Sequence, residues 1–315
     1  MVLLVANSRD FATDYVVAQL IRRGAPYYRL DLDLLEADSV SLDPVGRQLS
    51  VRGEPGDVTI TPQSLSGILF RAPTYLRESS SGRWSSEELL QRHQWAAFAR
   101  SLIVLDCPAW INYPPSVYLA ECKPYQLCVA SRVGFAVPES RVANIAPSPD
   151  APVWDSDAAL AVKALDSFLL RVDGEDAFFY TRRITAADAG REAVSAMPLI
   201  FQRYLGKKLD LRATVVRDQC FTASVTVDGR GVDGDWRLAK RQAAFAAYDL
   251  PPEIRLKCME LTRELGLLYG AIDLALVDGT YYFLEINPTG EWAWLVEATG
   301  MRIDEALADA LCTKR

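Results

Sequence analysis

Histidine is almost absent from this chain, because His93 is the only one among its 315 residues. It lies in a charged segment that reads as a helix beginning after Ser85, where a lone histidine is expected on the surface. The catalytic triads of hydrolases and most zinc sites depend on histidine. The composition therefore argues against a histidine-dependent hydrolase and against a zinc enzyme.

Cysteine pairs and long apolar runs are missing too. None of the six cysteines forms a C-x-x-C pair, so small core residues are their expected role. No apolar stretch is as long as a membrane span, and the apolar start at residues 2–6 turns polar too soon for a signal peptide. The sequence therefore predicts a cytoplasmic protein with no membrane partner.

Positive charge is also in deficit, since the formal net charge is −7. An acidic surface argues against general binding of nucleic acid or of anionic membranes. Half of the residues are hydrophobic and 24% are charged, as in a globular enzyme. Any phosphate site must therefore be built from lysine and arginine that are concentrated locally.

Strand and helix patterns alternate over residues 1–108, which predicts an α/β domain with a partly parallel sheet. A linker rich in Pro and Trp follows, and residues 153–180 favour a small antiparallel domain. Beyond residue 199, strand-like runs surround an amphipathic helix that is expected over 253–269. The chain is therefore long enough, and varied enough, for three subdomains.

The clearest chemical signal lies near the C-terminus, where residues 283–290 read FLEINPTG. Glu285 and Asn287 are two apart in a strand, so their side chains point the same way. Asp273 lies just upstream in a second strand-like run. Oxygen ligands of this kind suit Mg²⁺ that carries nucleotide phosphates.

The loop between these strands decides whether the three side chains meet. A two-residue turn at Asp278-Gly279 would pair Asp273 with Leu284 and put Asp273 and Glu285 on opposite faces. A three-residue loop over 277–279 would place Asp273, Phe283, Glu285 and Asn287 on one face. The other face would then be apolar, with Ile272, Leu274, Leu276, Tyr282, Leu284 and Ile286. We predict the three-residue loop; the alternative is an ordinary hairpin with charges on its solvated face.

Lys163 lies within the apolar run 160–165, where an unpaired charge would be costly. We therefore expect a functional role for this lysine, although a surface lysine is the alternative.

Four segments resemble the ATP-grasp superfamily of carboxylate ligases, and within it the maturases of ribosomal peptides that make graspetides such as microviridins. They are residues 3–7 with Asp10, residues 111–123, residues 201–212 and residues 284–294. This chain departs from the family pattern at three places. Cys122 replaces the usual Asn, and Glu291 replaces the usual Gln. Residues 70–73, which read FRAP, are a weakened form of the family's aromatic-Arg-Arg-Pro segment.

The resemblance implies an α/β (α+β) ATP-grasp fold with an N-terminal pre-ATP-grasp domain (1–108), a central subdomain (109–198) and a C-terminal antiparallel-sheet subdomain (199–315). It implies ATP and Mg²⁺ as cofactors. Such a ligase activates a carboxylate as an acyl phosphate, which an amine or hydroxyl then attacks.

The resemblance also assigns roles to residues at matching positions. Asp273, Glu285 and Asn287 would hold Mg²⁺, and Lys123 and Lys163 would bind phosphates. The hinge residues Gln202, Arg203, Tyr204 and Leu205 would offer backbone groups to adenine, and Asp210 would bind the ribose. Arg212 would contact the acceptor carboxylate or acyl phosphate and Arg237 the γ-phosphate. The alternatives are an ordinary polar strand for the hinge and structural ion pairs for the arginines.

The implied partner is a ribosomal precursor peptide with a leader and a core. Residues 184–198 of this chain would help to bind the leader. The enzyme would form ω-ester or ω-amide crosslinks within the peptide. Two alternatives stay open: a ligase that joins an amino acid to a small molecule or a protein tail, and an inactive binding module. A homodimer is expected only by analogy.

Overall fold

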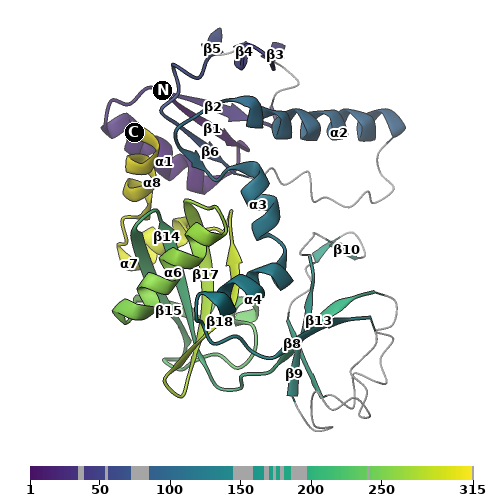
Figure 1. The fold of residues 1–315 in the computed structure, drawn as a ribbon, viewed down its shortest axis with the longest axis vertical. Coiled ribbons are helices and arrows are strands. Elements are labelled where there is room, and N and C mark those ends of the chain that lie inside the picture. Colours follow the sequence, from purple (N-terminus) through teal and green to yellow (C-terminus); the bar gives the residue numbers. More distant parts are fainter. Residues whose placement is uncertain are drawn as a thin grey trace.

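The computed structural model describes residues 1–34, 39–53, 56–71, 85–144, 159–166, 170–172, 175–177, 181–185, 197–239 and 241–313. Over these residues the chain is a mixed α/β protein (Figure 1). The N-terminal region is at the top of the view, a small sheet is at the lower right and the largest sheet is at the lower left. The predicted fold class is confirmed.

The N-terminal region is built on a four-stranded parallel sheet in the order β2-β1-β6-β7. Its strand β1 is buried along its whole length, as its apolar sequence predicts. A separate antiparallel sheet contains β3, β4 and β5. The bounds are β1 Val2–Ala6, α1 Phe11–Arg22, β2 Tyr27–Asp31, β3 Ser39–Asp43, β4 Gln48–Arg52, β5 Val58–Ile60, β6 Gly67–Phe70, α2 Ser86–Ser101, a short 3₁₀ turn Leu102–Val104 and β7 Trp110–Ile111.

The predicted start of α2 is confirmed. Ser85 accepts a hydrogen bond from the Glu88 N–H, and the Glu88 carboxylate accepts one from the Ser85 N–H. His93 is exposed on this helix, in agreement with a surface role.

The C-terminal helix α8 (Ile303–Cys312) packs against α1, so the two ends of the chain lie near each other (Figure 1). Val16 and Leu20 are buried one helical turn apart on α1. At the same interface Gln19 Nε2 donates to Asp304 Oδ2 at 2.5 Å. The last helix therefore closes the N-terminal region.

A single asparagine ties the linker after β7 to the last sheet. Asn112 is only 1% exposed. Its Nδ2 donates to the carbonyls of Tyr269 and Pro288, both at 2.8 Å. Its Oδ1 accepts from the N–H groups of Leu268 and Tyr269 at 2.8 and 2.9 Å. This side chain therefore fixes both ends of the hairpin that carries the predicted metal ligands.

Asn112→Ala is expected to lower the free energy of unfolding by about 3 kcal/mol, because it leaves several buried backbone groups without partners. Urea denaturation would measure this. The exposed Asn144 offers a matched control, since Asn144→Ala should stay within about 0.5 kcal/mol of the parent. Equal urea midpoints for the two variants would contradict the role given to Asn112.

The central region is an antiparallel sheet in the order β12-β9-β13-β8. Two helices lead into it, and the second has Pro124 in its first turn, as predicted. The bounds are α3 Pro114–Ala120, α4 Lys123–Arg132, β8 Ser140–Ala143, β9 Ala159–Ala164, β10 Leu170–Val172, β11 Glu175–Ala177, β12 Arg182–Thr185 and β13 Leu199–Arg203. Most of the expected leader-binding region, at residues 186–196, lies outside the described residues.

The C-terminal sheet is antiparallel, in the order β16-β15-β14-β17-β18. Helix α6 packs on one face, and α7 and α8 cover part of the other. The bounds are β14 Leu209–Val216, β15 Gln219–Val227, a 3₁₀ turn Trp236–Ala239, β16 Ala243–Ala247, α6 Pro252–Glu264, β17 Tyr269–Val277, β18 Thr280–Asn287 and α7 Ala293–Thr299.

Helix α6 is shorter than the sequence predicts. It ends at Glu264 because Gly266, at φ +69°, takes the left-handed conformation that stops a helix. Leu268 and Tyr269 then lead into the sheet, so the expected helical extension to residue 269 is wrong.

The predicted three-residue loop is also wrong. Val277 pairs with Thr280, so the turn has two residues, Asp278 at φ +46° and Gly279 at φ +78°. A β-bulge between Asp273 and Leu274 then shifts the register. This shift pairs Asp273 with Glu285, so the metal ligands share a face for a different reason.

The bulge also reverses the faces on which Phe283 and Leu284 were expected. Phe283, expected on the acidic face, is fully buried with Leu274 in the core beneath α6. Leu284, expected in that core, lines a pocket on the acidic side. The predicted apolar face is therefore wrong for Leu284 and for Tyr282, which lies outside that core.

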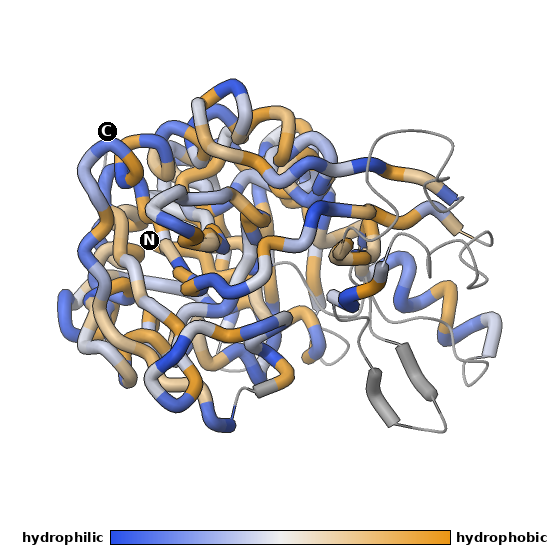
Figure 2. Tube along the Cα trace, turned by 90° about the horizontal axis from the view of Figure 1, so that it is seen from below, coloured by the Kyte–Doolittle hydropathy of each residue, from blue (hydrophilic) through white to orange (hydrophobic). Residues whose placement is uncertain are grey.

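Apolar and polar segments alternate along the chain at short intervals, without a long uniformly apolar stretch in the part described (Figure 2). Among these residues no helix is long and apolar enough to span a membrane.

All six cysteines are free thiols, but only Cys258 is fully buried, and Cys122 and Cys128 are exposed. The expectation of core cysteines is therefore wrong for those two.

Candidate functional site

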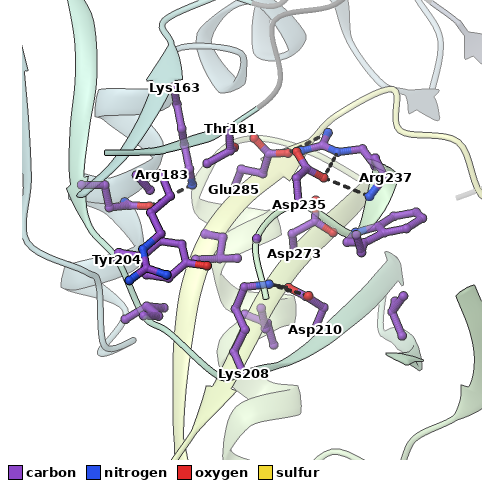
Figure 3. A pocket seen from close by; sticks show the side chains of 18 of the residues that line it. Lys163, Thr181, Arg183, Tyr204, Lys208, Asp210, Asp235, Arg237, Asp273 and Glu285 are labelled. Atoms are coloured by element: carbon purple, nitrogen blue, oxygen red, sulfur yellow. Dashed lines mark hydrogen bonds and ion pairs between the residues drawn. The ribbon is translucent and has the colours of Figure 1, made fainter. Parts of the chain in front are cut away.

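A pocket lies between the central sheet and the C-terminal sheet, and charged side chains converge on it from both (Figure 3). Nine of the twelve predicted site residues line it: Lys163, Gln202, Arg203, Tyr204, Leu205, Asp210, Arg237, Asp273 and Glu285. The other three, Lys123, Arg212 and Asn287, lie outside its lining. Residues from five separate segments of the chain are thus brought together.

Three charged residues form one row across the C-terminal sheet. Arg212 on β14 pairs with Asp273 on β17, which pairs with Glu285 on β18. Paired residues of antiparallel strands present their side chains on the same face. Arg212 Nε lies 3.3 Å from Asp273 Oδ1, and Asn287 Nδ2 lies 3.5 Å from Glu285 Oε1. Register alone therefore gathers an arginine, two acids and an amide.

The pKa values of the two acids are shifted in opposite directions. Burial raises the pKa of Asp273 to about 6, although the guanidinium of Arg212 opposes it. Burial acts in the same direction on Glu285, but Arg237, followed by Lys163 and Lys123, outweighs it and holds that pKa at about 2. Both carboxylates are therefore ionised at neutral pH.

The residues fit a magnesium ion. Two carboxylates on directly paired strands offer hard oxygen donors, and each side chain is only about 15% exposed (15% for Asp273, 14% for Glu285). Within the described ranges no cluster of three His, Cys, Asp or Glu could hold a metal. A third protein ligand would therefore have to be the Asn287 amide, with phosphate oxygens completing the shell.

Magnesium binding is expected to weaken in acid, because a proton and Mg²⁺ compete for Asp273. With a pKa of about 6 the carboxylate is ionised above that pH and protonated below it. Glu285 does not titrate in this window, since its pKa is about 2. Affinity should be flat above about pH 7 and fall about tenfold per unit below about pH 6. The rise in Tm on adding MgADP, followed against pH, measures this change in affinity. An equal rise in Tm at about pH 5 and about pH 8 would contradict the prediction.

Arg212 carries unused hydrogen-bonding capacity. It is 8% exposed, and neither its Nε nor its Nη1 has a hydrogen-bond partner among the described residues. The 3.3 Å contact with Asp273 is therefore an ion pair without hydrogen-bond geometry. Buried donors without partners are costly, so these groups suit an anionic oxygen of a ligand.

Lys163 reaches the pocket from β9 and is positioned by a buried amide. Its Nζ donates to Gln202 Oε1 at 2.8 Å, while Gln202 Nε2 donates to Ser140 Oγ at 2.9 Å. Burial lowers the pKa of Lys163, and Glu285 opposes that effect. Lys123 Nζ instead donates to the Leu165 carbonyl at 3.1 Å.

The hinge offers fewer free backbone groups than expected. The Arg203 N–H already donates to the Glu139 carbonyl at 2.8 Å, and the Tyr204 N–H to the Ala159 carbonyl at 3.0 Å. The Leu205 N–H has no acceptor within the described part of the chain. Leu205 is therefore the hinge residue whose donor could meet the edge of a base.

The lining of the pocket also contains an ion pair between Lys208 and Asp210. Lys208 Nζ contacts both oxygens of Asp210, and both side chains are nearly buried. Burial raises the pKa of Asp210, although Lys208 opposes it. Sequence analysis selected Asp210 but gave no role to Lys208, which lines the pocket beside it.

Asp235 is a second pocket residue that sequence analysis missed. Its Oδ1 accepts from Arg237 Nε at 2.9 Å, and its side chain is 3% exposed. Its Oδ2 is buried and has no partner among the described residues. Arg237 also lies 3.7 Å from Glu285 through Nη1. The adjacency of Asp235 and Arg237 in the sequence was the available signal.

No protein-family model matches the chain, and no curated protein is similar to it in sequence. Solved structures are similar over its whole length. The macrocyclase MdnC of Microcystis aeruginosa MRC, bound with its precursor peptide MdnA, has a TM-score of 0.81 at 25% identity, with 99% of each chain covered. MdnB of the same organism has a TM-score of 0.72 at 25% identity and the same coverage.

A third structure, at 21% identity, is the Chryseobacterium gregarium RiPP-associated ATP-grasp ligase in complex with ADP and a leader and core peptide. Its TM-score is 0.83, and it covers 100% of this chain and 97% of its own. The chain therefore has the ATP-grasp fold, and it resembles the peptide macrocyclases and RiPP-associated ligases of that superfamily, as its motifs predicted.

Proposed function

We propose that this chain is an ADP-forming ligase that activates Asp or Glu side chains of a ribosomal precursor peptide and joins them, within the peptide, to hydroxyl or amino groups. The observation that carries the proposal is the row of Arg212, Asp273 and Glu285. The two acids of this row line a pocket that Lys163 enters from the opposite sheet. Structures similar to this chain are bound to ADP and to precursor peptides.

In the first step a peptide carboxylate oxygen attacks the γ-phosphorus of ATP, giving an acyl phosphate and ADP. Magnesium, when bound by Asp273, Glu285 and Asn287, would neutralise phosphate charge during this transfer. Lys163 adds positive charge from the central sheet, and Lys123 adds it from the start of α4. Arg237 contacts the transferred phosphoryl group, with its guanidinium oriented by Asp235 at 2.9 Å.

In the second step a hydroxyl or amine of the same peptide attacks the acyl carbon. Inorganic phosphate leaves, the nucleophile loses its proton, and each ring costs the peptide one water. The unpartnered donors of Arg212 hold the acceptor carboxylate and then the developing oxyanion. Positioning and charge neutralisation supply the catalysis, so no covalent enzyme intermediate is needed.

The proposal also covers nucleotide contacts, domain limits, oligomeric state and location. The Leu205 N–H would donate to adenine, and Asp210 would bind the ribose. The domains would meet at residues 108/109 and 198/199, and the protein would be a cytoplasmic homodimer.

Peptide-dependent ADP release tests this proposal. The probes are candidate precursor peptides from adjacent reading frames, synthesised whole and added with ATP and Mg²⁺. Equal release of ADP and phosphate, only with peptide present, is expected. ADP release that requires a free amino acid instead would move the function to an intermolecular ligase, and no release from a correctly folded protein would favour a binding module.

A further inference from the structure

The outer strand of the C-terminal sheet has an unprotected edge. Strand β16 pairs with β15 on one side, and no described residue pairs with it on the other. Its sequence, AAFAA, contains no charge and no proline, and Ala244, Ala246 and Ala247 are exposed. Natural proteins block such edges with charges, prolines or bulges, because an open edge pairs with another chain. A free apolar edge is therefore a candidate peptide-binding surface.

The ladder identifies which backbone groups point outward. The Tyr248 N–H donates to the Thr222 carbonyl at 2.8 Å, and the register sets these two residues opposite each other, so they are a hydrogen-bonded pair of the ladder. Hydrogen-bonded pairs recur at every second residue of an antiparallel ladder, so Ala246 and Ala244 also bond inward to β15. The N–H and C=O groups of Ala243, Phe245 and Ala247 therefore face away from the sheet.

This edge is in register with the pocket. Phe245 pairs with Val225, which pairs with Asp210, and the latter two line the pocket. Ala247 pairs with Ala223, which pairs with Arg212. At about 4.8 Å between strands, a chain added to the edge would run about 14 Å from the backbone of Arg212. About four extended residues, at about 3.3 Å each, would cover that distance.

Side chains at the edge indicate the chemistry of an occupant. Phe245 contacts Trp236 and Trp294, with ring centroids 5.8 and 4.4 Å apart, and Trp236 lines the pocket. The exposed Arg241, two residues before β16, places positive charge at the end where the strand begins. An apolar edge with aromatic rings and a flanking arginine suits an extended acidic peptide.

We propose that β16 binds an extended stretch of the acidic substrate peptide by strand addition, through the outward amides and carbonyls of Ala243, Phe245 and Ala247. This inference rests on the proposed function and specifies how the substrate is held. The added strand places an Asp or Glu about four residues further along at Arg212. Main-chain hydrogen bonds to β16 tolerate varied peptide sequences. The side chains near the pocket therefore select which Asp or Glu of the peptide is activated.

Proline at an outward amide tests the proposal without removing a ladder bond. Ala247→Pro deletes one outward N–H and blocks the edge, and edge strands tolerate proline there. Ala243→Pro does the same at the other end of β16 if the first variant folds poorly. Ala246→Ser is the matched control, because its amide faces inward. The readouts are KM for a candidate precursor peptide that supports ADP release, affinity for ADP, and hydrogen exchange of β16.

Both proline variants are expected to raise the peptide KM at least about tenfold, with ADP affinity and the Ala246→Ser variant unchanged. The peptide should slow exchange of the three outward amides in the parent. An unchanged peptide KM overturns strand addition while the proposed function stands. Conversion of a dimer into monomers by the proline variants, seen by sedimentation, overturns it in favour of a subunit interface. If the parent does not modify the peptide, the proposed function fails first and this inference with it.

Discussion

Glu285→Gln is expected to reduce ATP turnover by about 10³-fold, because it removes one of the two charges that would hold magnesium while keeping the side-chain volume. Glu285 lies in the cross-strand row with Asp273, and four cations, led by Arg237, hold its pKa at about 2. Its ionisation therefore contributes stability above about pH 4, which is lost as pH falls through its folded pKa. The variant should fold cooperatively but with a lower Tm.

Glu291→Gln is the matched control for this prediction. It makes the same chemical change six residues along, at a side chain that is 50% exposed and 3.1 Å from Arg71. Turnover by this variant is expected to stay within about threefold of the parent. Parent-like ADP release by correctly folded Glu285→Gln protein would remove Glu285 from the metal site.

Lys163→Gln is expected to weaken nucleotide binding by about 30-fold, since it deletes a buried charge facing the phosphates. The amide keeps much of the length and can still bond with Gln202, which lies 2.8 Å from the lysine nitrogen. Isothermal titration with ADP and Mg²⁺ measures the loss.

Lys207→Gln provides the comparison, because Lys207 is exposed and outside the pocket lining. It makes the same charge change near the hinge, so a general loss of electrostatic attraction would weaken both variants equally. Equal ADP affinities for the Lys163 and Lys207 variants would show that Lys163 does not contact the phosphates.

Sequence alone predicted that Asp273 and Glu285 share a face, but it predicted the wrong cause. The alternation of polar and apolar residues cannot distinguish a longer loop from a bulge, because both move the register by one residue. The choice depends on a distant segment. Phe283 N donates to the Ala136 carbonyl at 2.9 Å, and the Phe283 ring packs 6.1 Å from that of Phe135. No local pattern contains that contact.

Elements with strong local signals were predicted well. The capping box at Ser85 and the proline-started helix at Lys123 follow from residues within one turn. Two pocket residues supplied by loops, Asp235 and Lys208, were not predicted. They enter the site because of how the chain runs between strands, which only the assembled sheets determine.

Mass spectrometry of candidate precursor peptides from adjacent reading frames, after incubation with the protein, ATP and Mg²⁺, tests the central claim most directly. We expect stepwise losses of one water per ring, absent without ATP and absent with Glu285→Gln. A gain in mass equal to an added amino acid, or an unchanged peptide despite ADP release, would contradict an intramolecular peptide ligase.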